Sequence, residues 1–369
     1  MKKQLSSIDL HFILKELEIL KDSRIDKLYQ PEKNLLVFSF YKTNSGKKIL
    51  KINVGKSLFL AEGKEDYEET LGFGMLLRKH IDGFFLCDSV QIEPERIIKL
   101  SFKSKDVKKN LYIEFFGKGN AILCDENGLI INALEHHEFK DRTIYPKIIY
   151  KHPAMKYNLF DLNKSSISEL LKNSAKGSII TSLATELGLG GIYSEEVCLL
   201  ANIEKDKNPK SINDKESGLI LSSIKQIINK KSTPQVILEN DNPVDFIPFD
   251  LEFYKNHKKR KFQTFNEALE FFYSHYREIK ETEFDKKLKS LCRIIEEQKT
   301  AIDDLRKEEI ESREKGELIY HKYGIVREIL DEINKASKKC SWKEIKEKLK
   351  EHKIVKEVNE KDRKIVVEI

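Results

Sequence analysis

The sequence predicts an α+β fold: a strand-rich N-terminal region, then a helical region, then a long heptad-patterned helix with a small α/β piece after it. Three patterns support this prediction. Residues 1–153 carry short apolar runs separated by turn residues. Residues 154–275 show helical spacing, broken at 207–213 and by a proline-bearing stretch at 233–250. Residues 276–335 repeat apolar residues at spacings of four and three. Residues 336–369 add one amphipathic helix and a strand-like end, IVVEI. A chain of 369 residues can bury two or three sizeable cores.

The N-terminal region reads as a run of strands interrupted by two helices. Ser6 or Ser7 can cap the first helix, because apolar residues follow at spacings of three and four. A second helical patch covers 73–80. Short turns at 44–46 and 125–128 make antiparallel pairing the expected arrangement. The predicted strands are 24–30, 35–41, 49–54, 57–60, 84–92, 97–102, 111–116, 121–124 and 129–135.

The helical region contains LGLGGIYSEE, residues 187–196, with glycines at Gly188, Gly190 and Gly191. A dinucleotide site needs a strand before such glycines and the order G-x-G-x-x-G, and neither is present. A helix, a tight glycine turn and a second helix fit instead, as in a helix-hairpin-helix element. Two interpretations remain open: amides at the start of the second helix hold a nucleic-acid phosphate, or the glycines form a packing turn without a ligand.

A basic run, Lys258, Lys259, Arg260 and Lys261, is flanked by Phe253, Tyr254 and Phe262. Cations interleaved with aromatic rings suit an RNA backbone with bases stacked on the rings. A solvated linker is the alternative.

The last region carries a heptad seam, which begins at Phe284 and continues to Leu305. The phase lapses at Glu309, Ser312 and Gly316 and resumes at Ile319. One helix over about fifty residues would extend ~75 Å. Its apolar stripe is buried only against a partner, so a coiled coil and self-association through this seam are predicted.

Composition excludes several classes of protein. The net charge is only +6, so an anionic partner must be met by local basic patches. The chain has no signal peptide and no apolar run long enough for a membrane span, so a cytoplasmic protein without membrane partners is expected. No metal and no cofactor are expected, because the cysteines show no CxxC and no close histidine. They are Cys87, Cys124, Cys198, Cys292 and Cys340.

Several stretches along the chain carry a family likeness: 7–9, 27–30, 75–79, Gln91 with 95–96, 113–120, Arg142 with 150–153, 187–196, and 316–320 with Trp342. No single stretch decides the resemblance, but their order and spacing are specific. Together they resemble the NFACT family of ribosome quality-control factors, which includes NEMF-like proteins, bacterial RqcH and proteins once labelled fibronectin-binding protein A.

The resemblance implies an N-terminal domain similar to that of formamidopyrimidine-DNA glycosylases. It implies binding to a large ribosomal subunit that carries a stalled peptidyl-tRNA, and recruitment of tRNA for template-independent extension of the nascent chain. The ribosome would form the peptide bonds, so no catalytic residue and no enzyme activity are expected. The tRNA-facing residues would be Asp9, Arg78, Lys79, Glu95 and Arg96, with phosphate contacts at Gly188, Gly190, Gly191 and 258–261.

Full members of the family continue into a returning coil and a C-terminal RNA-binding domain. This chain ends before both, so the sequence suggests a fragment or the first half of a split protein.

The sequence argues against two other functions. A nucleic-acid glycosylase or lyase with this fold uses an N-terminal proline amine, a neighbouring glutamate and a C-terminal zinc finger. The start Met1-Lys2-Lys3 supplies neither of the first two, and the cysteine spacing gives no finger. An extracellular-matrix adhesin rests only on an old family label, and the lack of an export signal argues against it.

Overall fold

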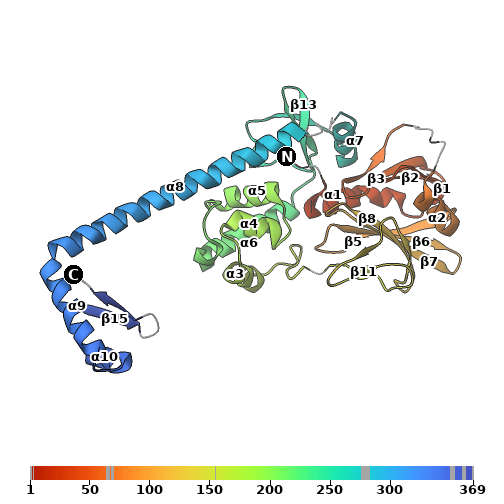
Figure 1. The fold of residues 1–369 in the computed structure, drawn as a ribbon. Coiled ribbons are helices and arrows are strands. Elements are labelled where there is room, and N and C mark those ends of the chain that lie inside the picture. The colour runs from red at the N-terminus through yellow and green to blue at the C-terminus, as the bar shows by residue number, and fades with distance from the viewer. Residues whose placement is uncertain are drawn as a thin grey trace. The chain divides into compact units, whose positions relative to one another are not determined.

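A nine-stranded antiparallel sheet, in the order β4-β3-β2-β1-β5-β6-β7-β8-β9, forms the N-terminal part of the structure (Figure 1). The computed structural model describes residues 2, 4–63, 67, 70–153, 155–275, 283–349, 354–359 and 363–367. It divides into two units, Met1–Arg277 and Glu278–Ile369, and each is described by itself. The strands are β1 Arg24–Glu32, β2 Leu35–Lys42, β3 Gly46–Asn53, β4 Ser57–Ala61, β5 Phe85–Gln91, β6 Ile97–Ser104, β7 Val107–Glu114, β8 Asn120–Asp125 and β9 Ile130–Ala133.

Two helices accompany the sheet, α1 (Ser7–Leu17) and α2 (Gly72–Ile81), so the predicted strand-rich α+β fold is confirmed. Ser6 is the residue that caps α1. The Asp9 amide donates to Ser6 Oγ at 3.1 Å, and the Ser6 amide donates to Asp9 Oδ2 at 2.8 Å, which makes a capping box. Both faces of β2 are buried: neighbouring residues along the strand, Val37, Phe38, Ser39 and Phe40, are all buried.

After a short hairpin of β10 (His137–Glu138) and β11 (Thr143–Ile144), the chain becomes helical. One core of buried apolar residues continues from the sheet into these helices; the rings of Phe59 in β4 and Tyr273 in α7, for example, lie 5.9 Å apart. The domain limits expected from the sequence therefore stay predictions. The helices are α3 Lys164–Asn173, α4 Ile179–Thr185, α5 Gly191–Ala201, α6 Asp214–Ile228 and α7 Phe265–His275, with 3-10 turns at Glu18–Leu20, Pro209–Ser211 and Glu252–Tyr254.

The region predicted as helices also contains a three-stranded antiparallel sheet, which the sequence analysis missed. Its order is β13 (Asn242–Ile247), β12 (Gln235–Glu239) and β14 (Lys258–Lys261). Asn240 and Asp241 form the two-residue turn between β12 and β13, both with positive φ, as a type I′ hairpin requires. Pro243 is tolerated because β13 is an edge strand. The basic run is thus a strand and not a linker.

The second unit begins with α8 (Glu283–His321) and α9 (Tyr323–Ser337). The single long helix expected here is interrupted at Lys322, where φ is −110° and ψ is 28°. The described seam side chains Leu291, Ile295, Ile302 and Leu305 are exposed. The coiled coil and self-association through it therefore stay predictions. Beyond α9, helix α10 (Trp342–Lys348) and the antiparallel pair β15 (Val355–Asn359) and β16 (Lys364–Val367) agree with the expected small α/β piece.

Glu16, near the end of α1, caps the start of α7, about 250 residues away along the chain. Its Oε1 accepts a hydrogen bond from the Phe265 amide at 2.7 Å, and its Oε2 accepts from the amide and side-chain nitrogens of Asn266 at 2.9 and 2.6 Å. A carboxylate at a helix N-terminus satisfies donors that have no intrahelical acceptor and opposes the positive end of the helix dipole.

We expect Glu16→Ala to lower the free energy of unfolding by about 1–2 kcal/mol, the usual cost of a lost N-terminal cap. Glu18→Ala is the matched control, because Glu18 is exposed one helical half-turn further on. Urea unfolding followed by circular dichroism measures both. Equal stability of the two variants would contradict the assignment of Glu16 as a cap.

Candidate nucleic-acid site between the sheet and the helical hairpin

A pocket of about 630 Å³ lies where the sheet meets the turn between α4 and α5. Segments far apart in the sequence line it. They are Ser6, the cap of α1; Pro94, Glu95 and Arg96 between β5 and β6; Phe116 after β7; Phe139, Asp141 and Arg142 of the β10–β11 hairpin; Pro153 and Met155; and Ala184, Thr185, Gly188 and Gly190. The pocket thus brings together four residues that the sequence singled out: Glu95, Arg96, Gly188 and Gly190.

Glu95 and Arg96 are neighbouring residues of opposite charge, and both are partly removed from water. Glu95 is 8% exposed, and this burial raises the pKa of its carboxyl; the Met155 backbone and the nearby charges of His152, Arg142 and Arg96 oppose the shift. Burial also lowers the pKa of Arg96, against the attraction of Glu95 and Asp9. Among the described residues, Glu95 Oε1 has no hydrogen-bond partner. A buried carboxylate oxygen without a donor is costly and is typical of a functional site.

Arg142 is a pocket residue that sequence reasoning did not assign to the site. Its guanidinium is buried and forms a two-pronged pair with Glu114, with Nη1–Oε1 at 2.5 Å and Nη2–Oε2 at 3.1 Å. Tyr150 donates to the same carboxylate at 2.9 Å. The guanidinium lies over the rings of Phe116 and Phe139, 5.6 and 4.9 Å from their centroids. Arg142 and its two polar partners all lie in stretches that carry the family resemblance, 113–120 and Arg142 with 150–153, but their distance in sequence gave no sign that they meet.

The glycine stretch is a helix, a tight turn and a helix, as expected. Gly188 and Gly190 both have φ of 78°, a conformation that side chains rarely adopt, and Gly190 is the N-cap of α5. A Cβ at Gly188 would lie 2.9 Å from Met155 Cε, whereas one at Gly191 would meet nothing within 4 Å. The positive φ is what requires glycine at Gly188, and its phosphate contact stays a prediction; Gly191 leaves the start of α5 open. The first amides of a helix have no intrahelical acceptor and attract anions.

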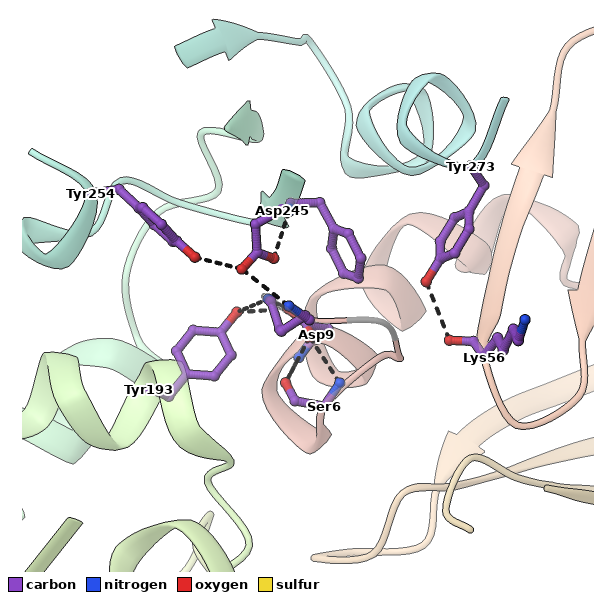
Figure 2. Close-up of polar contacts among 9 residues, drawn as sticks. Ser6, Asp9, Lys56, Tyr193, Asp245, Tyr254 and Tyr273 are labelled. Carbon is purple, nitrogen blue, oxygen red and sulfur yellow. Dashed lines mark hydrogen bonds and ion pairs between the residues drawn. The ribbon is translucent and has the colours of Figure 1, made fainter. Parts of the chain in front are cut away.

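Asp9 does not line the pocket; it is completely buried, and Figure 2 shows its polar partners. Its Oδ2 accepts from the amide and hydroxyl of Ser6 at 2.8 and 2.7 Å. Its Oδ1 accepts from Lys2 Nζ at 2.8 Å and from the Tyr193 hydroxyl at 2.6 Å. With 0% exposure, Asp9 has no surface that an RNA can touch. As a tRNA-binding position it stays a prediction, and only an indirect role fits this geometry.

The same network continues into β13 (Figure 2). Asp245 accepts from the Tyr254 hydroxyl at 2.5 Å and from the Lys2 amide at 3.3 Å, and burial raises the pKa of its carboxyl. The Lys2 ammonium lies over the rings of Tyr193 and Phe246. Tyr254, which was expected beside the basic run as a stacking surface, is therefore buried and hydrogen-bonded.

The remaining predicted cations lie outside the pocket. Lys258 pairs with Asp241 at 2.5 Å and Lys259 with Asp250 at 2.6 Å. Arg260 lies over the rings of Phe262 and Phe271, and Lys261 is exposed.

On α2, the two cations differ in their surroundings. Arg78 donates from Nε to the Leu28 carbonyl at 2.5 Å and lies over Tyr29, while Lys79 is exposed. None of these α2 and β14 cations is brought to Glu95 and Arg96 by the fold.

Within the described ranges, no group of three or more histidine, cysteine, aspartate or glutamate side chains could hold a metal ion. The same part of the chain has no helix whose length and apolar character would let it cross a membrane.

Residues 6–364 match the model of the NFACT N-terminal and middle domains. The chain belongs to the NFACT family. It is 27% identical over its whole length to the archaeal Rqc2 homolog aRqcH of Methanocaldococcus jannaschii, of which it covers 58%. It is 24% identical, over 94% of its length, to human ribosome quality control complex subunit NEMF, of which it covers 35%. The chain thus spans little more than half of the first relative and about a third of the second.

Solved structures support the fold alone. The fibrinogen binding protein of Staphylococcus aureus matches 73% of this chain and 98% of its own, at 21% identity and a TM-score of 0.61. The N-terminal part of the fibronectin/fibrinogen-binding protein of Streptococcus suis covers 74% of this chain at 20% identity and a TM-score of 0.58. A Lactococcus lactis Fpg–DNA complex reaches a TM-score of 0.34, which is too low for any inference.

The raised pKa of Glu95 predicts that its ionised carboxylate lowers the stability of the fold at neutral pH. An acid whose pKa is higher in the folded than in the unfolded state costs no stability well below its unfolded pKa, and it destabilises once pH rises through the folded value. We therefore expect Glu95→Gln to melt at a higher temperature than the parent chain at pH 7, with the difference narrowing towards pH 4.

Glu93→Gln is the control, since Glu93 is exposed two residues away. Thermal melts across this pH range test the prediction. A Glu95→Gln variant that is less stable at pH 7 than at pH 4, relative to the parent, would show that the carboxylate is compensated in the fold.

Proposed function

We propose that this NFACT protein is an RNA-binding ribosome quality-control factor. It binds the large ribosomal subunit with a stalled peptidyl-tRNA, in the cytoplasm, and recruits tRNA for template-independent tailing of the nascent chain. The observation that carries the proposal is the pocket, where the partly desolvated pair Glu95–Arg96 lies beside the open start of α5. The names of the relatives, an Rqc2 homolog and a ribosome quality control subunit, support the same role.

Arg96 is the residue with which the pocket would hold RNA. Its planar guanidinium can pair with two oxygens of a phosphate or with a base edge. Glu95 and Asp9 attract this cation, so they orient it without themselves supplying a positive charge. The amides at the start of α5 add donors for a phosphate and carry no sequence preference. The site is thus suited to one specific polar contact beside a non-specific one.

No catalytic role is proposed for any residue, since the ribosome would form the peptide bonds. The glycosylase or lyase alternative is not favoured, because the relatives are named as quality-control factors. A lyase needs an accessible amine as nucleophile, and the Lys2 ammonium is instead paired with Asp9 at a side-chain exposure of 10%. The titles of the similar structures name fibrinogen and fibronectin, but identities near 20% support only the fold.

Replacing Arg96 with alanine is expected to weaken tRNA binding by about 5- to 150-fold, equivalent to ~1–3 kcal/mol for a specific polar contact. Lys258→Ala or Arg260→Ala should weaken binding of all RNAs and lower its salt dependence, as expected for backbone contacts. Fluorescence anisotropy with tRNA across a salt series separates the two behaviours. Early melting of Arg96→Ala combined with normal binding by its folded fraction would make Arg96 structural.

The start of α5 is best tested at Gly191. Positive φ at Gly190 makes every substitution there strained, whereas Gly191 is exposed, with open space at its Cβ position. Aspartate in the first turn favours a helix by about 0.3–1 kcal/mol but repels phosphate. We therefore expect Gly191→Asp to keep or raise the melting temperature and to weaken RNA binding, with Gly191→Ala close to the parent in binding. If Gly191→Asp binds RNA as well as Gly191→Ala does, the glycine turn serves packing alone.

A further inference from the structure

Phe139 is an exposed aromatic residue at the wall of the pocket. It follows β10, lines the pocket with Glu95 and Arg96, and keeps 45% of its surface exposed. Because this exposed ring lines the pocket together with Phe116, a flat group bound there would cover apolar surface that water now contacts. Nothing else about the proposed tRNA site requires a ring at this position, because Arg96 and the start of α5 account for the polar contacts.

The Phe139 ring has a cation as its neighbour on the hairpin. The Arg142 guanidinium lies over it, 4.9 Å from the centroid, and the Phe139 amide donates to the Arg142 carbonyl at 2.8 Å. Arg142 is itself fixed by its two-pronged pair with Glu114. A ring whose orientation is set before binding loses little conformational entropy when a ligand stacks on it. A base on the other face of the ring would complete a stack in which the ring lies between the Arg142 guanidinium and the base.

We propose that Phe139 is a stacking platform for an unpaired nucleobase of the bound RNA. This inference rests on the proposed RNA-binding function and names the feature of the RNA that the pocket takes. Each nucleobase has a flat π face and stacks on phenylalanine with little regard to sequence. A base inside a duplex has both faces covered, so the pocket would select a loop, bulge or single-stranded end. A pocket of about 630 Å³ has room for one nucleotide beside Arg96.

A matched control lies on the same hairpin. Tyr145 follows β11, is 42% exposed and does not line the pocket. The probe is a fluorescent RNA stem-loop, compared with a fully paired duplex of the same stem, and its Kd is measured by anisotropy. We expect Phe139→Ala to raise the Kd for the stem-loop about 5- to 150-fold, the range of one base–aromatic stack. Tyr145→Ala should leave the Kd unchanged. Phe139→Trp should bind at least as tightly as the parent because it keeps an aromatic face, and Phe139→Leu should lose affinity although it is apolar.

Abasic stem-loops give the second measurement. Each loop nucleotide is replaced in turn by an abasic ribose, which removes the stacking face and keeps the phosphates. One position should weaken binding to the parent chain by the same factor as Phe139→Ala, with no further loss when the two changes are combined. The salt slope should not change, because no phosphate contact is removed. Thermal melts confirm that the variants are folded.

The outcomes separate the inference from the function on which it rests. If Arg96→Ala weakens stem-loop binding while Phe139→Ala behaves like Tyr145→Ala, the platform is wrong and the RNA site stands. Independent losses from the abasic site and Phe139→Ala also overturn the platform. If neither Arg96→Ala nor Phe139→Ala affects RNA binding, the proposed function fails at this pocket.

Discussion

The buried carboxylate of Asp9 is the interaction on which the candidate site depends. An ionised carboxylate without water must have its lone pairs satisfied, and four donors do this: two from Ser6, one from Lys2 and one from Tyr193. Ser6 begins α1 and Tyr193 lies in the first turn of α5, so one side chain ties the sheet region to the helical hairpin. Ser6 and Gly190, the N-caps of these two helices, both line the pocket. The contacts of Asp9 therefore help to fix the pocket's shape, although Asp9 itself does not line it.

Glu95 shows the opposite use of the same chemistry. Both Asp9 oxygens have donors, whereas Glu95 Oε1 has none among the described residues, although both side chains are buried. Burial raises the pKa of Glu95, which means that the folded chain carries a charge at a cost in stability. Proteins keep such incompletely compensated groups where binding requires them. Arg142 belongs to the compensated kind, since Glu114 and Tyr150 complete its partners, and it supplies rigidity in place of a free charge.

Much of this fold could be predicted from the sequence, because strand alternation, turn residues and the Ser6 cap are local signals. The three-stranded sheet was missed because three prolines in 234–248 suggested breaks and because Asn240-Asp241 is a less familiar hairpin turn than Asn-Gly. The interruption at Lys322 was not predicted, because the residue there is neither glycine nor proline and Gly324 lies inside the helix that follows. In the site, Glu95 and Arg96 were found through a resemblance, and the glycines through the pattern of a helix, a glycine turn and a helix in 187–196. The burial of Tyr254 and the Arg142–Glu114–Tyr150 cluster depend on contacts between distant segments, which no periodicity reports.

The distribution of charge explains why local geometry must provide recognition. A net charge of +6 over 369 residues attracts RNA weakly, and the two lysines of β14 that pair with Asp241 and Asp250 add little to that field. The Lys258–Asp241 pair is exposed on both sides, so it contributes little stability and can be exchanged for a phosphate. Specific affinity must then come from groups already oriented and partly desolvated before binding, where polar contacts are stronger than in water. Among the predicted contacts in the described chain, Arg96 fits this description: it lines the pocket, it is partly buried, and the charges of Glu95 and Asp9 attract its guanidinium.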